Sequence, residues 1–252
     1  RTRLVPKKVP VHREGKVHMA IRWVDPTKGQ TKTASGLPIP PAWTDVKVNP
    51  DSKAALQAMG HDSKGRTQYL YSQEHSQKQA AAKFKRLEAF NKALPVIRQR
   101  IQKDLGSSQE AQILYLIDKT AFRIGSNDET QAAQKAYGIS TLLGRHVNVV
   151  GNRLEFDFIG KKGVRIQKTI EDPVAAKIMR QHKTGDDQLL FSVNDNDVRK
   201  YIHSLTKKHF VIKDFRTWHG TNLALQEIAK RPIPQTQKEF KKARKAVAEV
   251  VS

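Results

Sequence analysis

The stretch Lys213-Asp-Phe-Arg-Thr-Trp-His-Gly-Thr-Asn222 holds the residues of this chain that are best suited to chemistry. Lys213, Arg216 and His219 recur every three residues and would share one face of a helix. An arginine on a firmly packed helix suits phosphate binding, because its planar guanidinium stays charged and donates hydrogen bonds in pairs. The ordinary alternative is a helix with a partly solvated basic face.

Two further basic residues stand at the ends of predicted elements. Arg123 lies in Phe122-Arg-Ile-Gly125, at the end of a predicted hydrophobic helix. Lys161 lies at the tip of a predicted hairpin, Phe158-Ile-Gly-Lys-Lys-Gly163. Both positions also have plain explanations, since a cation stabilises a helix C-terminus and hairpin tips are commonly polar.

The charge balance points to a polyanionic partner. The 252 residues include 46 basic and 24 acidic side chains, a formal net charge of +22, and such an excess favours nucleic acid. A membrane surface is the second choice, but no long apolar run and no signal peptide occurs. Localisation in the cytosol is therefore expected.

Several kinds of site are excluded or disfavoured. The chain has no cysteine, which excludes disulfides, a thiol nucleophile and Cys-based zinc sites. No pair of histidines has helical ligand spacing beside a carboxylate, and no paired carboxylates stand out, which argues against a two-metal nuclease. We therefore expect no metal and no other cofactor.

Residues 1–75 are predicted to form a small β-rich domain. Alternating apolar residues predict a strand at 17–23, closed by the turn residues Asp25-Pro26 and Gly29. A short strand around Val46 and Val48 and a hairpin from 54 to 71 follow, whereas the basic, proline-containing residues 1–15 suit a loose, extended lead-in.

Residues 76–252 are predicted to be mostly helical with an inserted sheet. Pro95 should break or kink a helix that begins near residue 77, and a second helix should run from there to about Leu105. A further helix should run from Ser108 to Gly125. Three strands are expected between 146 and 170. The remaining predicted helices span 172–182, 195–209, 213–231 and 234–252.

Gln68, Tyr69 and Tyr71 lie on one predicted strand, with the two tyrosines on the same face. A half-buried aromatic pair is the common role of such tyrosines. The alternative is a polar and aromatic edge that enters a DNA groove beside Lys64 and Arg66.

Four of these stretches, in order and separation, resemble the type IB DNA topoisomerases of the poxvirus-like and bacterial group. They are Gly60-His-Asp-Ser-Lys-Gly-Arg-Thr-Gln-Tyr-Leu-Tyr71, Phe122-Arg-Ile-Gly125, Phe158-Ile-Gly-Lys-Lys-Gly163 and Lys213-Asp-Phe-Arg-Thr-Trp218. The resemblance covers nearly the whole chain. It implies an α+β fold: a β-rich N-terminal domain and a larger, mostly helical catalytic domain with an inserted three-stranded antiparallel sheet.

The resemblance also implies roles for individual residues. Arg123 and Arg216 would bind the scissile phosphate, and Lys161 would be the general acid, with a pKa lowered by the two arginines. Lys213 stands where the related tyrosine recombinases have a histidine, which favours a topoisomerase. The remaining implied DNA contacts are Gln68, Tyr69 and Tyr71 in the major groove, Lys64 and Arg66 beside them, and Gly125, Lys135 and Tyr137 at phosphates.

By the same resemblance, the protein would relax supercoiled duplex DNA without ATP or metal. A tyrosine would attack one strand, form a 3′-phosphotyrosyl link and let the cut end rotate before resealing. The domains would close around DNA as a C-shaped clamp, opening through a linker near residues 71–80. A monomer is expected, located in the cytoplasm at a bacterial nucleoid or, if viral, in a virion.

The nucleophile is the point of departure. The family's tyrosine should lie about fifty residues beyond Arg216, yet all five tyrosines of this chain precede Arg216. We therefore expect the chain as given to lack its nucleophile and to be inactive. His219 could replace a missing base or be an ordinary helix-face histidine. A tyrosine recombinase or integrase, and a DNA-binding protein without a nucleophile, remain the alternative functions.

Overall fold

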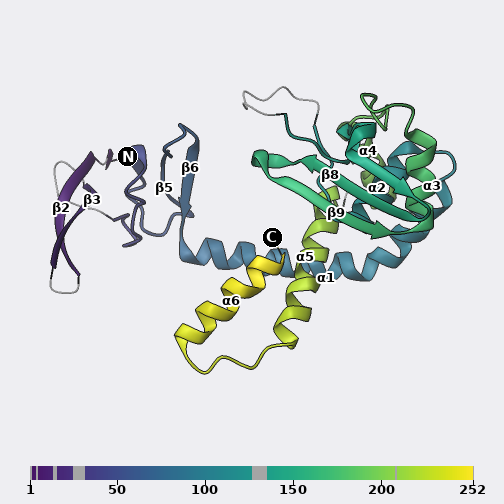
Figure 1. The fold of residues 1–252 in the computed structure, drawn as a ribbon. Helices are drawn as coiled ribbons and strands as arrows, with labels where there is room; N and C mark the ends of the chain where they lie inside the picture. Colours follow the sequence, from purple (N-terminus) through teal and green to yellow (C-terminus); the bar gives the residue numbers. More distant parts are fainter. Residues whose placement is uncertain are drawn as a thin grey trace. The chain divides into compact units, whose positions relative to one another are not determined.

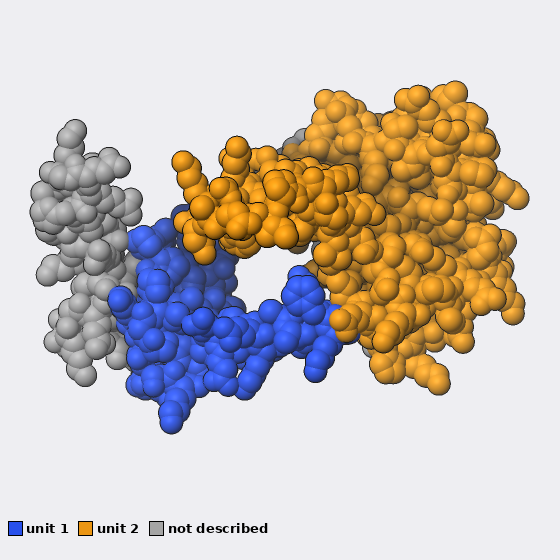
Figure 2. Space-filling view, turned by 90° about the horizontal axis from the view of Figure 1, so that it is seen from below, with its two compact units in different colours: residues 1–85 blue, residues 86–252 orange. Residues whose placement is uncertain are grey.

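The structure, a computed structural model, describes residues 2–3, 5–13, 16–24, 32–126, 135–207 and 209–251, with side chains from residue 32 onward. The chain divides into two compact units, residues 1–85 (unit 1) and 86–252 (unit 2), which are coloured separately in Figure 2. We expected a division after residue 75. The division instead falls inside helix α1, Gln73–Asp104, so the expected linker near 71–80 is helical from Gln73 onward.

Unit 1 contains two antiparallel sheets (Figure 1). The larger has the order β1-β4-β5-β6, formed by Thr2–Arg3, Thr44–Val48, Leu56–His61 and Thr67–Tyr71. Its small core includes Trp43, Val46 and Ala58. The hairpin predicted for 54–71 is confirmed. Its turn is held by Asp62, which accepts the backbone N–H groups of Lys64 and Arg66.

The second sheet of unit 1 corrects one prediction. Within the predicted loose lead-in, residues 5–13 are a strand, because β2 (Val5–Arg13) pairs along its whole length with β3 (Lys16–Val24), the predicted strand. Pro6 and Pro10 lie four residues apart, so their nitrogens face the same edge of β2. Proline is tolerated on the outer edge of a two-stranded sheet, because no neighbouring strand needs an N–H donor there. The predicted turn at Asp25-Pro26 and Gly29 lies outside the described residues.

Helix α1 also differs from expectation. Pro95 does not divide it: one helix runs from Gln73 to Asp104. Proline removes one helical hydrogen bond, that to the carbonyl of Asn91. Burial of Phe90, Leu94 and Ile97 on the inner side of the helix offsets that loss, because packing on both sides of the proline holds the helix in register.

Unit 2 is built around α2 (Gln109–Thr120), most of whose residues are buried. An antiparallel sheet of β7 (Val147–Val150), β8 (Arg153–Ile159) and β9 (Arg165–Glu171) lies in the order β7-β8-β9. The other helices are α3 (Pro173–His182), α4 (Asp195–Leu205), α5 (Ile212–Ala229) and α6 (Gln237–Val251). The α+β class with an inserted three-stranded sheet is confirmed (Figure 1). Within the described ranges, no helix has the length and apolar character needed to cross a bilayer.

Candidate active site in unit 2

The turn after α2 presents Arg123. The helix ends at Thr120, earlier than the predicted Gly125, because Ala121 takes the left-handed conformation (φ 58°) and donates its N–H to Ile117. The chain therefore leaves the helix axis before Phe122. The Phe122 ring packs edge-on against Phe156 and Phe158, at centroid distances of 5.2 and 5.1 Å. Arg123, the next residue, is exposed.

Arg216 lies on α5 and contacts the same turn. Its neighbour Phe215 is fully buried and packs edge-on against Phe90 at 5.1 Å, which anchors this part of the helix. The Arg216 Nε–H donates to the carbonyl oxygen of Ala121 at 2.6 Å. Burial and the nearby positive charge of Arg123 lower the pKa of Arg216. The hydrogen bond to Ala121 places Arg216 against the turn that carries Arg123.

The segment Tyr137–Ile139 joins this turn to the hairpin. Ile139 donates its N–H to the carbonyl of Arg123 at 2.9 Å, and Tyr137 donates its N–H to Ile159 at 2.8 Å. Gly138, between them, has no room for a side chain, since a Cβ there would lie 2.3 Å from the nitrogen of Gly125. The backbone around Arg123 is thereby tied to the strand end that precedes Lys161.

Lys161 begins the 3₁₀ turn Lys161–Gly163 between β8 and β9. The hairpin tip is closed by a hydrogen bond of 2.7 Å from the Gly160 N–H to Val164, and Lys162 and Gly163 both have positive φ angles. Lys161 is exposed. Among the described residues, neither its ammonium nor the Arg123 guanidinium has a hydrogen-bonding partner, so both remain available to an anion.

The remaining predicted residues of unit 2 lie on α5 and on the segments that flank the Arg123 turn and the Lys161 hairpin. Lys213 is exposed one turn before Arg216 on α5. Lys135 lies over the ring of Tyr137, with its Nζ 5.5 Å from the ring centroid, and that ring packs against His146 at 4.3 Å. Gly125 has a φ of 92°, which an L-residue with a side chain rarely adopts.

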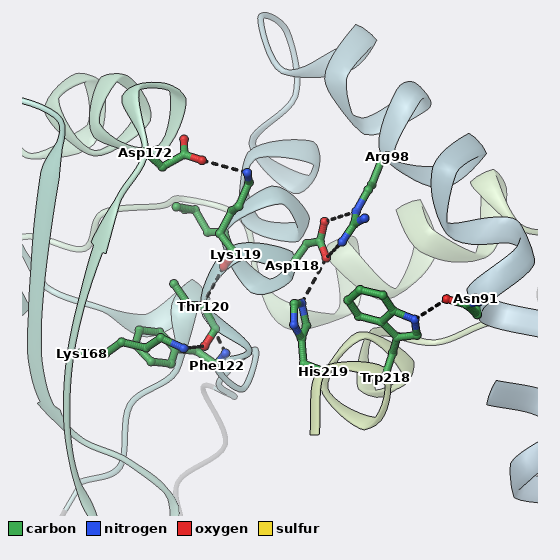
Figure 3. A network of polar contacts seen from close by, with 11 residues as sticks. Asn91, Arg98, Asp118, Lys119, Thr120, Phe122, Lys168, Asp172, Trp218 and His219 are labelled. Atoms are coloured by element: carbon green, nitrogen blue, oxygen red, sulfur yellow. Dashed lines mark hydrogen bonds and ion pairs between the residues drawn. The ribbon is translucent and has the colours of Figure 1, made fainter. Parts of the chain in front are cut away.

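A network of ion pairs holds α5 against α1 and α2 (Figure 3). The nearly buried carboxylate of Asp118 accepts two hydrogen bonds from Arg98, at 2.7 and 3.0 Å, and lies 3.2 Å from His219 Nε2. Burial opposes ionisation of Asp118, but the contacts with His219 and Arg98 hold its pKa below the ordinary value. His219 therefore belongs to a structural contact, which favours the helix-face interpretation over that of a substitute base.

A second ion pair fixes the start of α5. Arg86 donates to both carboxylate oxygens of Asp214, at 3.0 and 2.6 Å, and Asp214 accepts the N–H of Val211 at the helix N-terminus. Sequence reasoning missed both networks. Arg86 and Asp214 are 128 residues apart, and Arg98 and Asp118 are separated by a turn between helices, so no local pattern identifies either pair.

In unit 1 the two predicted groove tyrosines are exposed. Tyr69 and Tyr71 are 52% and 42% accessible, and their ring centroids lie 6.4 Å apart. About half of each residue is therefore open to contact by a ligand. Asp62 engages two of their neighbours, accepting hydrogen bonds from Arg66 Nε at 2.8 Å and Gln68 Nε2 at 3.0 Å. Arg66 holds the pKa of Asp62 at about 2. Lys64 is exposed at the hairpin turn.

Two tyrosines of unit 2 are engaged by carboxylates. Tyr115 donates its hydroxyl to Asp172, at 3.0 Å from either oxygen, and Tyr201 donates to Asp104 at 2.7 Å. Burial, reinforced by the adjacent carboxylate, raises the pKa of both hydroxyls. Among the described residues, no three His, Asp or Glu side chains gather in a way that could hold a metal.

Comparisons with known proteins agree with this geometry. The sequence profile of the family described as eukaryotic DNA topoisomerase I, catalytic core, matches residues 72–252, and that of the bacterial DNA topoisomerase IB N-terminal domain matches residues 27–62. The chain is 34% identical to DNA topoisomerase 1B of Acanthamoeba polyphaga mimivirus over 231 residues, which are 82% of this chain and 68% of that protein.

Eukaryotic relatives are more distant. DNA topoisomerase 1 of Homo sapiens is 25% identical over 188 residues, and DNA topoisomerase 1 alpha of Arabidopsis thaliana is 27% identical over 154 residues. These matches cover 66% and 58% of this chain, but only 24% and 17% of the relatives' own lengths. The match to the catalytic core and the identity to the viral enzyme both show that the chain belongs to the family of type IB DNA topoisomerases.

Proposed function

We propose that the protein relaxes supercoiled duplex DNA by cutting one strand through a 3′-phosphotyrosyl link and resealing it, without ATP or metal. The observation that carries the proposal is the pairing of Arg123 and Arg216 at one turn, because attack on a phosphodiester builds negative charge on the non-bridging oxygens. Arg216 is held through Nε alone, so within the described residues its two terminal NH₂ groups are left to donate to a phosphate.

In this proposal Lys161 is the general acid. The leaving 5′-oxygen is strongly basic and must receive a proton as the P–O bond breaks. The hairpin gives Lys161 an exposed ammonium, and the Tyr137–Ile139 segment ties the base of that hairpin to the Arg123 turn. The proton donor Lys161 would thereby keep a fixed position relative to the phosphate-binding arginines.

We further propose that the attacking tyrosine comes from chain beyond residue 252, since all five tyrosines of this chain precede Arg216, whereas the family's nucleophile is expected after it. For the same reason a DNA-binding protein without a nucleophile is the second candidate function. The two are distinguished by supercoil relaxation in EDTA, using a chain extended past Ser252. Relaxation supports the topoisomerase, whereas strand exchange would identify a recombinase, and binding without cleavage would leave the second candidate.

The role of Lys161 has its own test in the extended chain. Lys161→Ala should slow strand cleavage by about 10²–10⁴-fold. A substrate with sulfur in place of the 5′-bridging oxygen should restore the rate, because a thiolate leaves without being protonated. Lys162→Ala, one residue further along the same turn, is the matched control. An equal loss on both substrates would contradict the general-acid role.

DNA binding is proposed to use the exposed Tyr69 and Tyr71 of unit 1 together with the phosphate contacts near Lys135, Tyr137 and Lys213. The net charge of +22 should make affinity fall steeply with salt, because each neutralised phosphate releases counterions. Tyr69→Ala should weaken binding without changing the salt slope, whereas Lys213→Ala should reduce the slope by about one. Equal slopes for the wild type and Lys213→Ala would argue against a phosphate contact at Lys213.

A further inference from the structure

Lys168 lies on β9, on the strand that leaves the Lys161 hairpin, and reaches the end of α2. Its Nζ donates to the carbonyl oxygen of Thr120 at 2.9 Å (Figure 3). The residue as a whole is exposed, but its ammonium end is partly desolvated, and this burial lowers the pKa of Lys168. Within the described ranges no carboxylate pairs with it. A lysine that loses water without gaining a counter-ion needs another compensating contact.

The compensation is the negative end of a helix. Thr120 is the last residue of α2, and the last carbonyls of a helix carry partial negative charge and lack helical partners. Two consecutive carbonyls at this end accept hydrogen bonds from cations on other elements: Thr120 from Lys168, and Ala121 from Arg216. A strand and a helix therefore hold one turn from two directions.

That turn determines where Arg123 lies. Ala121 is left-handed, a conformation that is unfavourable for a residue with a side chain, so it must be held in place by its surroundings. The Thr120 hydroxyl accepts the N–H of Phe122 at 3.2 Å, and the Thr120 carbonyl accepts the hydrogen bond from Lys168. Loss of Lys168 would leave the Thr120 carbonyl unsatisfied and loosen the backbone three residues before Arg123.

We propose that Lys168 is a positioning residue for the phosphate site: it fixes the turn that carries Arg123 and binds Arg216, and it couples that turn to the strand leading from Lys161. The inference rests on the proposed function for its catalytic meaning. A direct contact between Lys168 and DNA is the competing role.

The catalytic test uses the extended chain with Lys168→Met, Lys168→Arg and, as a matched control, Lys177→Met at an exposed lysine of α3. Lys168→Met should slow single-turnover cleavage by about 10²-fold, the effect of a misplacement of about 1 Å, while DNA affinity stays within about twofold. Lys168→Arg, which still donates to a carbonyl, should restore most of the rate. A parallel loss of affinity and rate would indicate a DNA contact and overturn the proposal.

A second measurement does not require activity. In the 252-residue chain, amide hydrogen exchange at Ala121, Phe122 and Ile139 should become at least about tenfold faster in Lys168→Met and stay unchanged in Lys177→Met. Lys168→Gln, with a shorter polar side chain, serves if the methionine variant does not fold. Unchanged exchange would overturn the positioning role. If the extended wild-type chain fails to relax DNA, the proposed function fails, while exchange still decides whether Lys168 holds the turn.

Discussion

The Arg216 guanidinium and the Ala121 carbonyl are joined by a hydrogen bond of 2.6 Å that spans 95 residues of sequence. It uses the Nε edge of the guanidinium, so the same side chain that would bind a phosphate also holds the turn that presents Arg123. The position of each arginine therefore depends on the other's element: α5 holds the turn that carries Arg123, and that turn holds the Arg216 side chain.

Arg216→Lys should separate these two tasks. A lysine has a single nitrogen at its tip and lacks the planar fork, so it cannot hold the Ala121 carbonyl with one edge and present two parallel donors to a phosphate with another. Strand cleavage in the extended chain should fall by about 10²–10³-fold, with DNA affinity nearly unchanged. Arg199→Lys, at an exposed ion pair on α4, is the control. A cleavage rate within threefold of wild type, roughly 0.7 kcal/mol, would show that the fork is not needed.

Gly138 and Gly160 should respond differently to a methyl group. At Gly138 a Cβ would meet backbone, 2.3 Å from Gly125 N and 2.6 Å from the Arg123 carbonyl oxygen. At Gly160 it would meet the end of a flexible side chain, Cδ1 of Ile166, at 2.5 Å. Gly138→Ala should therefore destabilise unit 2 by about 2–4 kcal/mol and Gly160→Ala by about 1 kcal/mol. Denaturant unfolding measures both, and equal losses would contradict the close approach at Gly138.

The Arg98–Asp118 pair should be asymmetric. Arg98→Met leaves the nearly buried Asp118 carboxylate with His219 as its remaining cationic partner, whereas Asp118→Asn leaves Arg98, whose side chain is about half exposed, free to reach water. We expect losses of roughly 2–3 kcal/mol and roughly 1 kcal/mol, respectively, in the free energy of unfolding, because an unpaired buried charge costs more than an exposed one. Calorimetric unfolding of the two variants tests the order, and Lys177→Met is the control. A larger loss in Asp118→Asn would contradict this account.

Acid should weaken the same contact. The folded-state pKa of Asp118 lies below its ordinary value of 3.8, so the unfolded chain binds the proton more readily than the folded chain. The stabilisation is fully present above pH 3.8 and is lost as pH falls through the lower folded-state value. Asp118→Asn should therefore show a flatter loss of stability than wild type as the pH falls below about 4. Parallel curves would show that Asp118 contributes nothing to acid sensitivity.

The sequence identified the local patterns of this fold well. Strands β4, β5 and β6 of unit 1, the Lys161 hairpin and the amphipathic helices of unit 2 follow from periodicity and turn residues, which act over a few positions. It failed where long-range packing decides. Pro95 lies within a helix because Phe90 and Ile97 are buried on either side of it, and β2 becomes a strand because β3 pairs with it.

The candidate site shows the same division. The motifs around Arg123, Lys161 and Arg216 could be recognised one by one, because each has a local composition. Their supports could not. Asp118, Asp214 and Lys168 act through contacts with residues 20, 128 and 48 positions away, and nothing in the neighbouring sequence marks any of them as a partner.

Helix α1 continues across the boundary between the units, and this determines where the chain can be cut without disrupting unit 2. A fragment that begins at Arg86 would open the helix in mid-course, expose uncapped N–H groups and place the partner of Asp214 at a fraying end. A fragment that begins before Gln73 would keep those turns intact. Limited proteolysis within residues 73–85 should thus release a fragment of unit 2 in which the Arg86–Asp214 ion pair at the first turn of α5 is weakened.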